Sequence, residues 1–166
     1  MKKIVWENKS NKQLCITIPK NSGIKSGDIV SIEKEKIKKI VYSSVVADPF
    51  HYGHLEFLEE ANKLGELHIC GVLTDKATKK HRGKINLIFK ERRAMISAIR
   101  CVDMIMSQDN INPKDNLNLI QEQFPNSKII LVHGDNWDKI IGEREVKKLG
   151  GKAIKIPCYR RLIKND

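Results

Sequence analysis

The chain has 166 residues with a formal net charge of +11 and 31% charged residues, which suits one domain of ordinary size with a small appendage. No apolar run approaches the roughly 18 residues that a membrane helix needs, and polar residues follow the basic start MKKIVWENKS where a signal peptide would be apolar. These features argue against a membrane protein, and we expect a cytoplasmic one.

The first 38 residues predict a small β-rich segment. Residues 12–19 alternate like a strand, residues 20–28 have the composition of a turn, and residues 29–37 read as a second strand. A segment this short rarely folds alone, so it must pack on the rest of the chain or pair with a copy of itself. Residues 1–40 carry ten Lys and four acidic residues, so the excess of positive charge is concentrated here.

This segment resembles a known family of interleaved dimers. The stretch CITIPKNSGIKSGDIVSIEK, about 25 residues with its flanks, is similar to AbrB-like swapped hairpins. The resemblance implies a homodimer first and DNA contact second. A plain N-terminal β-hairpin is the alternative.

From residue 39 onward strands and helices alternate. The predicted strands lie at residues 39–47, 66–74, 103–107, 128–133 and 152–157. The predicted helices lie at residues 53–64, 87–101, 114–123 and 137–149, and a basic loop precedes the second of them. This alternation predicts an α/β fold with a Rossmann-like, doubly wound parallel sheet.

Three polar stretches fall just after predicted strands: DPFHYGH, TDKATKKHRGK and HGDNW. In such sheets ligands bind beyond the carboxyl ends of the strands, so one site is expected there. The four cysteines (Cys15, Cys70, Cys101 and Cys158) form no C-x-x-C pair, and no protein metal site is predicted.

The stretch DPFHYGH has the chemistry of an anion site. It stands at a strand-to-helix junction, where free backbone N–H groups and the helix dipole favour negative charge. Gly53 lets a phosphate approach the backbone, and His51 and His54, three residues apart, lie near one face. Imidazoles there can stabilise charge in an in-line displacement. A single histidine would more simply be a capping or packed residue.

ADPFHYGHLEFLEEA resembles the H-x-G-H signature of the nucleotidyltransferase superfamily. GVLTDKA, KERRAMISAIRCVD and HGDNWDK are similar to blocks of the small cytidylyltransferases, above all those of phosphonate biosynthesis and then the glycerol-3-phosphate enzymes. The resemblance covers residues 39–157 and implies the nucleotidyltransferase (HUP) type of Rossmann-like fold.

The resemblance also implies roles for single residues. His51, His54 and Lys84 match catalytic positions that grip the reacting phosphates. The matched nucleotide-binding positions are Val46, Ala47, Asp48, Phe50, Gly53, Arg82, Arg100, His133, Gly134, Asp135 and Trp137. Tyr159, Arg160 and Arg161 are candidates for binding the acceptor or a phosphate.

Several of these residues have a simpler explanation. Lys84 and Arg82 could be solvated loop charges, Arg100 could pair with Asp103, and Trp137 could pack at a helix start.

The implied reaction transfers CMP from CTP to a small phosphate or phosphonate acceptor and releases pyrophosphate. Mg²⁺ is expected to bind mainly through the triphosphate. Two alternatives remain: an adenylyltransferase of the same fold, similar to FAD synthases, and a DNA-binding regulator acting through the basic N-terminal segment, although we expect no DNA partner.

The chain departs from the family pattern in two places. Val45-Val46-Ala47-Asp48 stands where a glycine-containing G-x-F-D is usual. PCYRRLIKND stands where the family carries a Thr-, Gly- and Ser-containing phosphate motif, and this puts activity in doubt.

Overall fold

The structure is a computed structural model, and it describes residues 6–7, 12, 14–18, 20–30, 37–136 and 138–157. The chain divides into two compact units, residues 1–35 and residues 36–166. Each unit is described by itself. In the described part of the chain, no helix is both long and apolar enough to cross a membrane.

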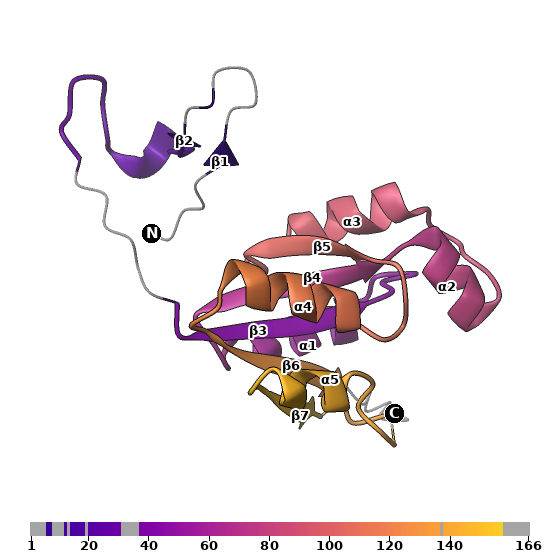
Figure 1. Cartoon of the computed structure of the whole chain (residues 1–166). Coiled ribbons are helices and arrows are strands. Elements are labelled where there is room, and N and C mark those ends of the chain that lie inside the picture. Colours follow the sequence, from indigo (N-terminus) through magenta and orange to yellow (C-terminus); the bar gives the residue numbers. More distant parts are fainter. Residues whose placement is uncertain are drawn as a thin grey trace, which may run out of the picture. The chain divides into compact units, whose positions relative to one another are not determined.

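The larger unit contains a five-stranded parallel sheet (Figure 1). Its strands are β3 (Lys39–Val45), β4 (Leu67–Leu73), β5 (Met104–Gln108), β6 (Lys128–Gly134) and β7 (Lys152–Ile156). Their order is β5-β4-β3-β6-β7, so the chain builds outward from β3 first on one side and then on the other. The predicted Rossmann-like fold is confirmed. In sheets of this kind ligands bind in the crevice at the carboxyl ends of the strands on either side of the switch in direction, which are here β3 and β6.

Helices cover both faces of this sheet (Figure 1). Leu117 and Ile120 of α4 and Val146 of α5 pack on one face, whereas Leu58 of α1 and Ile96 of α3 pack on the other. The helices are α1 (Tyr52–Asn62), α2 (Asp75–Arg82), α3 (Phe89–Ser97), α4 (Lys114–Gln123) and α5 (Glu143–Lys148).

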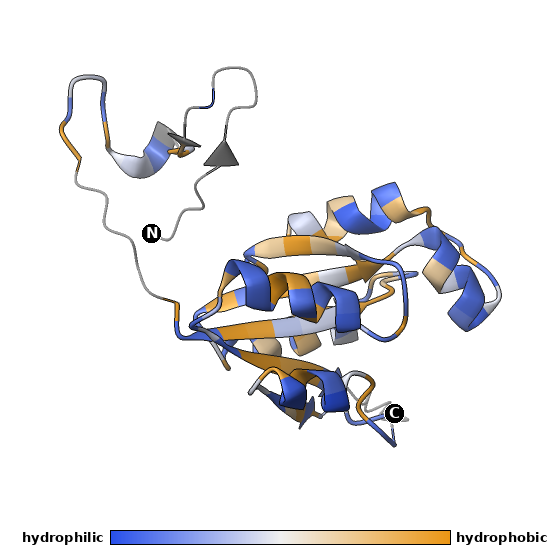
Figure 2. Cartoon of the chain, viewed as in Figure 1, coloured by the Kyte–Doolittle hydropathy of each residue, from blue (hydrophilic) through white to orange (hydrophobic). Residues whose placement is uncertain are grey.

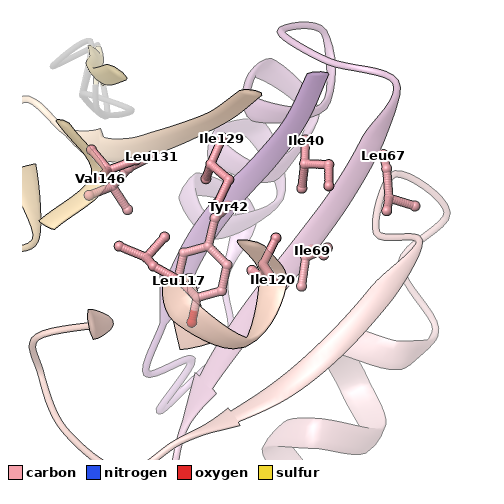
Figure 3. Close-up of a cluster of buried hydrophobic side chains, with 9 residues drawn as sticks. All are labelled: Ile40, Tyr42, Leu67, Ile69, Leu117, Ile120, Ile129, Leu131 and Val146. Carbon is pink, nitrogen blue, oxygen red and sulfur yellow. The ribbon is translucent and has the colours of Figure 1, made fainter. Parts of the chain in front are cut away.

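The strand sequences explain these two layers. Side chains alternate across a strand, so Ile40 and Tyr42 of β3 point into the cluster under α4 and α5, and Val41 and Val45 point to the opposite face. Figure 3 shows Tyr42 in the first cluster beside Leu117 and Ile120. A parallel sheet that is covered on both faces needs such continuous apolar strands.

Residues 75–82 form a helix, and our prediction of a loop there was wrong. The Oγ1 of Thr74 accepts a hydrogen bond from the Ala77 N–H at 3.4 Å and so caps the start of α2. Gly83, with φ of 78°, ends the helix in the left-handed conformation. The charged composition hid the helix, because few apolar residues mark its buried face; α2 is mostly hydrophilic in Figure 2.

Two predicted helices are shorter in the structure. α3 ends at Ser97, because Ala98 and Ile99 donate hydrogen bonds to carbonyls three residues back and tighten the chain into turns. α5 has only six residues, because Gly142 directly before it has φ of 91° and interrupts the helix predicted from residue 137.

The smaller unit contains a short antiparallel pair, β1 (Trp6–Glu7) with β2 (Leu14–Cys15), and the 3-10 helix η1 (Lys20–Ser22). Within the strand predicted at residues 12–19, Leu14 and Cys15 form β2 and pair with β1. Residues 29, 30 and 37 lie outside strands, and residues 31–36 lie outside the described part of the chain. The AbrB-like pairing and the dimer remain predictions.

Candidate active site

The turn between β3 and α1 forms the centre of the candidate site. It begins with Val46 and Ala47, both buried, and Ala47 has φ of 55°. A left-handed backbone at a non-glycine residue is uncommon and tends to be found at functional sites. The turn reaches α1 at His51, which is the residue preceding the first helical turn.

The two histidines of this turn lie side by side. Their ring centroids are 4.0 Å apart, and the Phe50 ring stacks on His54 at a centroid distance of 5.6 Å. The backbone N–H of His51 donates a hydrogen bond to Nδ1 of His54 at 3.3 Å. Since Nδ1 accepts this hydrogen bond, the proton of a neutral His54 ring must sit on Nε2.

His54 is neutral at physiological pH. Burial, together with the charges of His51 and Arg82, lowers its pKa to about 4. A neutral ring with the proton on Nε2 is a hydrogen-bond donor without a full charge. Together with the backbone N–H groups at the start of α1, it suits a phosphate oxygen.

Two predicted basic residues, Arg82 and Lys84, lie at this end of the sheet. Arg82 is the last residue of α2, and Lys84 lies just after the helix. Nη1 of Arg82 donates a hydrogen bond to the carbonyl of Asp48 at 3.2 Å, and Arg82 also contributes to the lowered pKa of His54. Lys84 follows two residues later and is exposed on the loop of residues 83–88. The structure thus brings the histidine turn and a basic segment together.

Asp48 binds this loop. Its Oδ2 accepts a hydrogen bond from the N–H of Asn86 at 2.7 Å, and its Oδ1 accepts one from the N–H of Leu87 at 2.9 Å. The Asn86 hydrogen bond is the main cause that lowers the pKa of Asp48, and the Leu87 hydrogen bond adds to it.

Arg92 is a site residue that the sequence analysis missed. Its side chain is fully buried and joins the ends of two strands, because Nη1 donates to the carbonyls of Val46 at 2.9 Å and Leu73 at 2.6 Å. Nε donates to the carbonyl of Leu87 at 2.9 Å, and Nη2 forms an ion pair with Asp75 at 2.8 Å. A signal was present, because Arg92 lies four residues from both Ile88 and Ile96, on the apolar stripe of the helix.

The end of β6 lines the other side of the crevice. β6 pairs with β3, and it carries His133 and Gly134, with Asp135 directly after it. His133 is buried, and burial together with the charge of Lys155 lowers its pKa. The N–H of Asp135 donates to the carbonyl of Ile156 at 2.9 Å and fixes this segment beside β7.

Arg100 does not join the site within one chain. It precedes β5, and its neighbours Cys101 and Asp103 hydrogen-bond to His68 at the start of β4. Five residues of β4, or roughly 17 Å of strand, separate this edge from the carboxyl ends. The prediction overlooked that a residue before a parallel strand lies at the opposite edge from one after it. Trp137, Tyr159, Arg160 and Arg161 lie outside the described residues.

A groove of about 380 Å³ opens at the carboxyl ends of β4 and β5. One wall is a face of α2 with Ala77, Lys80 and His81, which recur at helical spacing. The other wall is the segment between β5 and α4 and the first turn of α4. Its lining residues are Asp109, Asn110, Ile111, Asn112, Lys114 and Asp115.

A buried hydrogen-bond network fixes the second wall. The Tyr42 hydroxyl donates to Oε1 of Gln108 at 2.6 Å and accepts from Nδ2 of Asn116 at 2.8 Å. Nε2 of Gln108 in turn donates to the carbonyls of Asn110 at 2.8 Å and Ile111 at 3.2 Å. The groove is therefore built on backbone that the core holds in place.

The fold and the site together define an α/β domain that can bind a polyphosphate at the start of α1, the helix that follows β3. The chain belongs to the cytidylyltransferase-like family, whose sequence profile matches residues 46–162.

Curated relatives of this chain include the bifunctional protein HldE of two bacteria. The protein from Blochmanniella floridana is 37% identical over 129 residues, 75% of this chain and 26% of the relative. The protein from Geobacter sulfurreducens is 31% identical over 138 residues, 81% of this chain and 27% of the relative. The chain thus spans about a quarter of the length of these relatives.

Solved structures share the fold. A lipopolysaccharide core biosynthesis protein from Thermoplasma volcanium superposes with a TM-score of 0.61 at 24% identity, covering 75% of this chain and 99% of that one. A bifunctional NMN adenylyltransferase/ADP ribose pyrophosphatase from Francisella tularensis superposes with a TM-score of 0.54 at 17% identity, covering 76% of this chain and 39% of that one.

Proposed function

We propose that the chain transfers a nucleotidyl group from a nucleoside triphosphate to a phosphate oxygen of a small acceptor and releases pyrophosphate. The observation that carries this proposal is the histidine turn, in which the His51 N–H leaves a neutral His54 with its proton on Nε2. The basic residues Arg82 and Lys84 lie at the same end of the sheet. This is the arrangement that a triphosphate needs.

The reaction would proceed in one displacement. An acceptor oxygen forms a new bond to the α-phosphorus, the bond to the oxygen bridging to the β-phosphate breaks, and pyrophosphate leaves with that electron pair. His51, His54 and Lys84 would stabilise the charge that develops on the phosphate oxygens, and positioning does the remaining work. We propose that bound Mg²⁺ is ligated by phosphate oxygens and water and neutralises part of that charge.

CTP is the nucleotide that we propose. The sequence blocks around residues 71–77 and 133–139 resemble cytidylyltransferases. Membership of the cytidylyltransferase-like family supports the same choice of nucleotide. Proteins of this fold also include adenylyltransferases, so ATP is the competing nucleotide.

The groove between α2 and the β5–α4 segment is the place that we propose for the acceptor. It lies on the same end of the sheet as the histidine turn, two strands away, or about 10 Å. Its carboxylates and amides suit hydroxyl groups, and Lys80 and Lys114 suit a phosphate. No aromatic side chain is among its described lining residues. We therefore propose a small phosphorylated acceptor with hydroxyl groups.

Pyrophosphate release tests the proposal. Each of the four nucleoside triphosphates would be combined with Mg²⁺ and with glycerol 3-phosphate, a hexose 1-phosphate, phosphoethanolamine or a hydroxyalkylphosphonate. We expect release that requires both nucleotide and acceptor, fastest with CTP and a hydroxylated phosphate. Faster release with ATP would make the chain an adenylyltransferase, and no release with any pair would contradict the proposed reaction.

A further inference from the structure

The loop of residues 83–88 connects α2 to α3 and carries Lys84 beside the site. It begins at Gly83, whose N–H donates a hydrogen bond to the carbonyl of Lys79 at 2.7 Å and ends α2. Its other end is held by buried groups: Asp48 binds the N–H groups of Asn86 and Leu87, and Arg92 binds the carbonyl of Leu87. The position of Lys84 therefore depends on these side chains.

Asp48 is placed to link this loop to the histidine turn. It lies three residues before His51, and only 5% of its surface is exposed. Both of its carboxylate oxygens accept hydrogen bonds from the loop, and its own carbonyl accepts the hydrogen bond from Arg82. A carboxylate used in this way contacts protein backbone on both oxygens, which differs from the nucleotide contact that the sequence predicted.

We propose that Asp48 is a positioning residue that clamps the 83–88 loop to the histidine turn and thereby sets the position of Lys84. A substitution at Asp48 should act through Lys84 and not directly on the nucleotide. The effect of the clamp on catalysis rests on the function proposed above, whereas the clamp itself does not.

Two variants remove the clamp from opposite sides. Asp48→Asn keeps the size of the side chain but turns an NH₂ group toward one of the two loop N–H groups. Asn86→Pro removes one N–H donor and leaves Asp48 intact, so it tests the same contact if the first variant folds poorly. Asn86→Ala is the matched control, because it keeps the backbone N–H.

Hydrogen exchange reads the clamp without any substrate. We expect exchange of the Leu87 amide to speed up by about tenfold or more in Asp48→Asn and in Asn86→Pro. The increase should be smaller in Asn86→Ala, which removes the side-chain hydrogen bond of Asn86 to Asp48 but keeps both loop N–H groups. The amides of Ile130 and Leu131 in β6 report whether the sheet is intact. Unchanged exchange at Leu87 in both clamp variants, with β6 intact, would overturn the proposal.

A double-mutant cycle of Asp48→Asn with Lys84→Ala tests whether Asp48 positions Lys84. Its measured quantity is the rate of pyrophosphate release. We expect Asp48→Asn alone to lower kcat by about tenfold to a hundredfold. Lys84→Ala should lower kcat strongly in the parent chain but by less than about threefold in the Asp48→Asn background. Lys90→Ala, an exposed lysine on α3, should have the same small effect in both backgrounds.

The outcomes separate the clamp from the proposed function. If Lys84→Ala lowers kcat by the same factor in the parent chain and in Asp48→Asn, Asp48 does not position Lys84. This would hold even if hydrogen exchange shows that Asp48 clamps the loop. A parent chain that binds no nucleoside triphosphate would overturn the proposed function and the positioning role with it, and exchange at Leu87 would still decide whether Asp48 holds the loop.

Discussion

At the scale of single residues, His54 shows how a turn prepares a side chain for phosphate. Its ring contacts the rings of both His51 and Phe50, and the His51 N–H donates a hydrogen bond to its Nδ1. The pair was visible in the sequence as H-x-G-H, but the tautomer was not, because it depends on a backbone N–H whose direction only the folded turn defines.

The protonation of His54 can be measured directly. In nitrogen-15 NMR spectra of the ligand-free chain, we expect His54 to be neutral at pH 7 with its proton on Nε2 and to titrate near the predicted pKa of about 4. Burial disfavours the charged ring, and protonation would also remove the acceptor of the His51 N–H. A proton on Nδ1, or a pKa near the ordinary 6.5, would contradict this account of the site.

Arg92 is the residue on which most of the site's backbone depends. Arg92→Met should lower the free energy of unfolding by about 3–5 kcal/mol in urea denaturation. The reason is that Asp75 and the carbonyls of Val46, Leu73 and Leu87 lose their hydrogen-bond donor. Its neighbour Arg93 is exposed, so Arg93→Met should change that free energy by less than about 0.5 kcal/mol. Equal effects of the two substitutions would show that the Arg92 contacts do not stabilise the fold.

At the scale of elements, the central strand β3 is tied to the acceptor groove by one hydroxyl. Tyr42 sits in the core (Figure 3), yet its oxygen joins Gln108 at the end of β5 to Asn116 in α4. The apolar pattern predicted the strand, but it could not distinguish this tyrosine from a packed phenylalanine.

Tyr42→Phe tests this connection. It should lower the free energy of unfolding by about 1–3 kcal/mol, because Gln108 and Asn116 lose a buried partner. It should also raise KM for the acceptor more than KM for the nucleotide. Leu119→Ala, at an exposed position on α4, is the control and should leave both KM values within about twofold. A larger rise in KM for the nucleotide would contradict the placement of the acceptor.

His68 links β4 to its neighbours and makes the sheet sensitive to acid. Its Nδ1–H donates to the carbonyl of Cys101 at 2.7 Å, and Nε2 then accepts from the Ser43 hydroxyl at 2.8 Å. Burial lowers the pKa of His68 below its usual 6.5. The unfolded chain therefore binds more protons than the folded chain as the pH falls below about 6.5.

Stability should accordingly fall with acid. We expect the free energy of unfolding to be constant with respect to this histidine above about pH 7 and to decrease as the pH drops from 6.5 toward 5. In His68→Gln the slope of that free energy against pH should be shallower than in the parent chain. Urea denaturation at several pH values measures the slope, and an unchanged slope would rule out His68 as a cause.

The elements that sequence reasoning found are those with apolar periodicity. The five strands and α1 follow from runs of Val, Ile and Leu, whereas α2 was missed because its buried face is only Ala77 and Thr78. The early end of α3 and the late start of α5 arise from turn hydrogen bonds and from the backbone at Gly142, which periodicity does not report.

At the scale of the whole molecule, the fold class and the end of the sheet that carries the site followed from the strand–helix alternation. The organisation of the first 35 residues did not, because alternation over so short a segment does not define the partner of a strand. The homodimer and the weaker possibility of DNA binding both depend on that unit, which carries seven of the 31 Lys and Arg residues and a net charge of +3.

The two units should be separable. A chain of residues 36–166 should unfold cooperatively and retain nucleotide binding within about threefold of the full chain, because the described sheet, its helices and the histidine turn lie in that unit. Sedimentation of both chains should show a dimer only for the full chain. A shortened chain that fails to fold, or that forms the same dimer, would contradict the assignment of dimerisation to the N-terminal unit.

The central claim is that the turn beginning α1 binds a triphosphate through His54. Calorimetric titration with Mg²⁺ and CTP or ATP tests it without knowledge of the acceptor, by comparing the parent chain with His54→Ala and with His81→Ala, an exposed histidine on α2. We predict that His54→Ala raises Kd by about tenfold or more, equivalent to about 1.4 kcal/mol, and that His81→Ala leaves it within twofold. The same Kd in the parent chain and in His54→Ala, or no binding of any nucleoside triphosphate by the parent chain, would contradict the account.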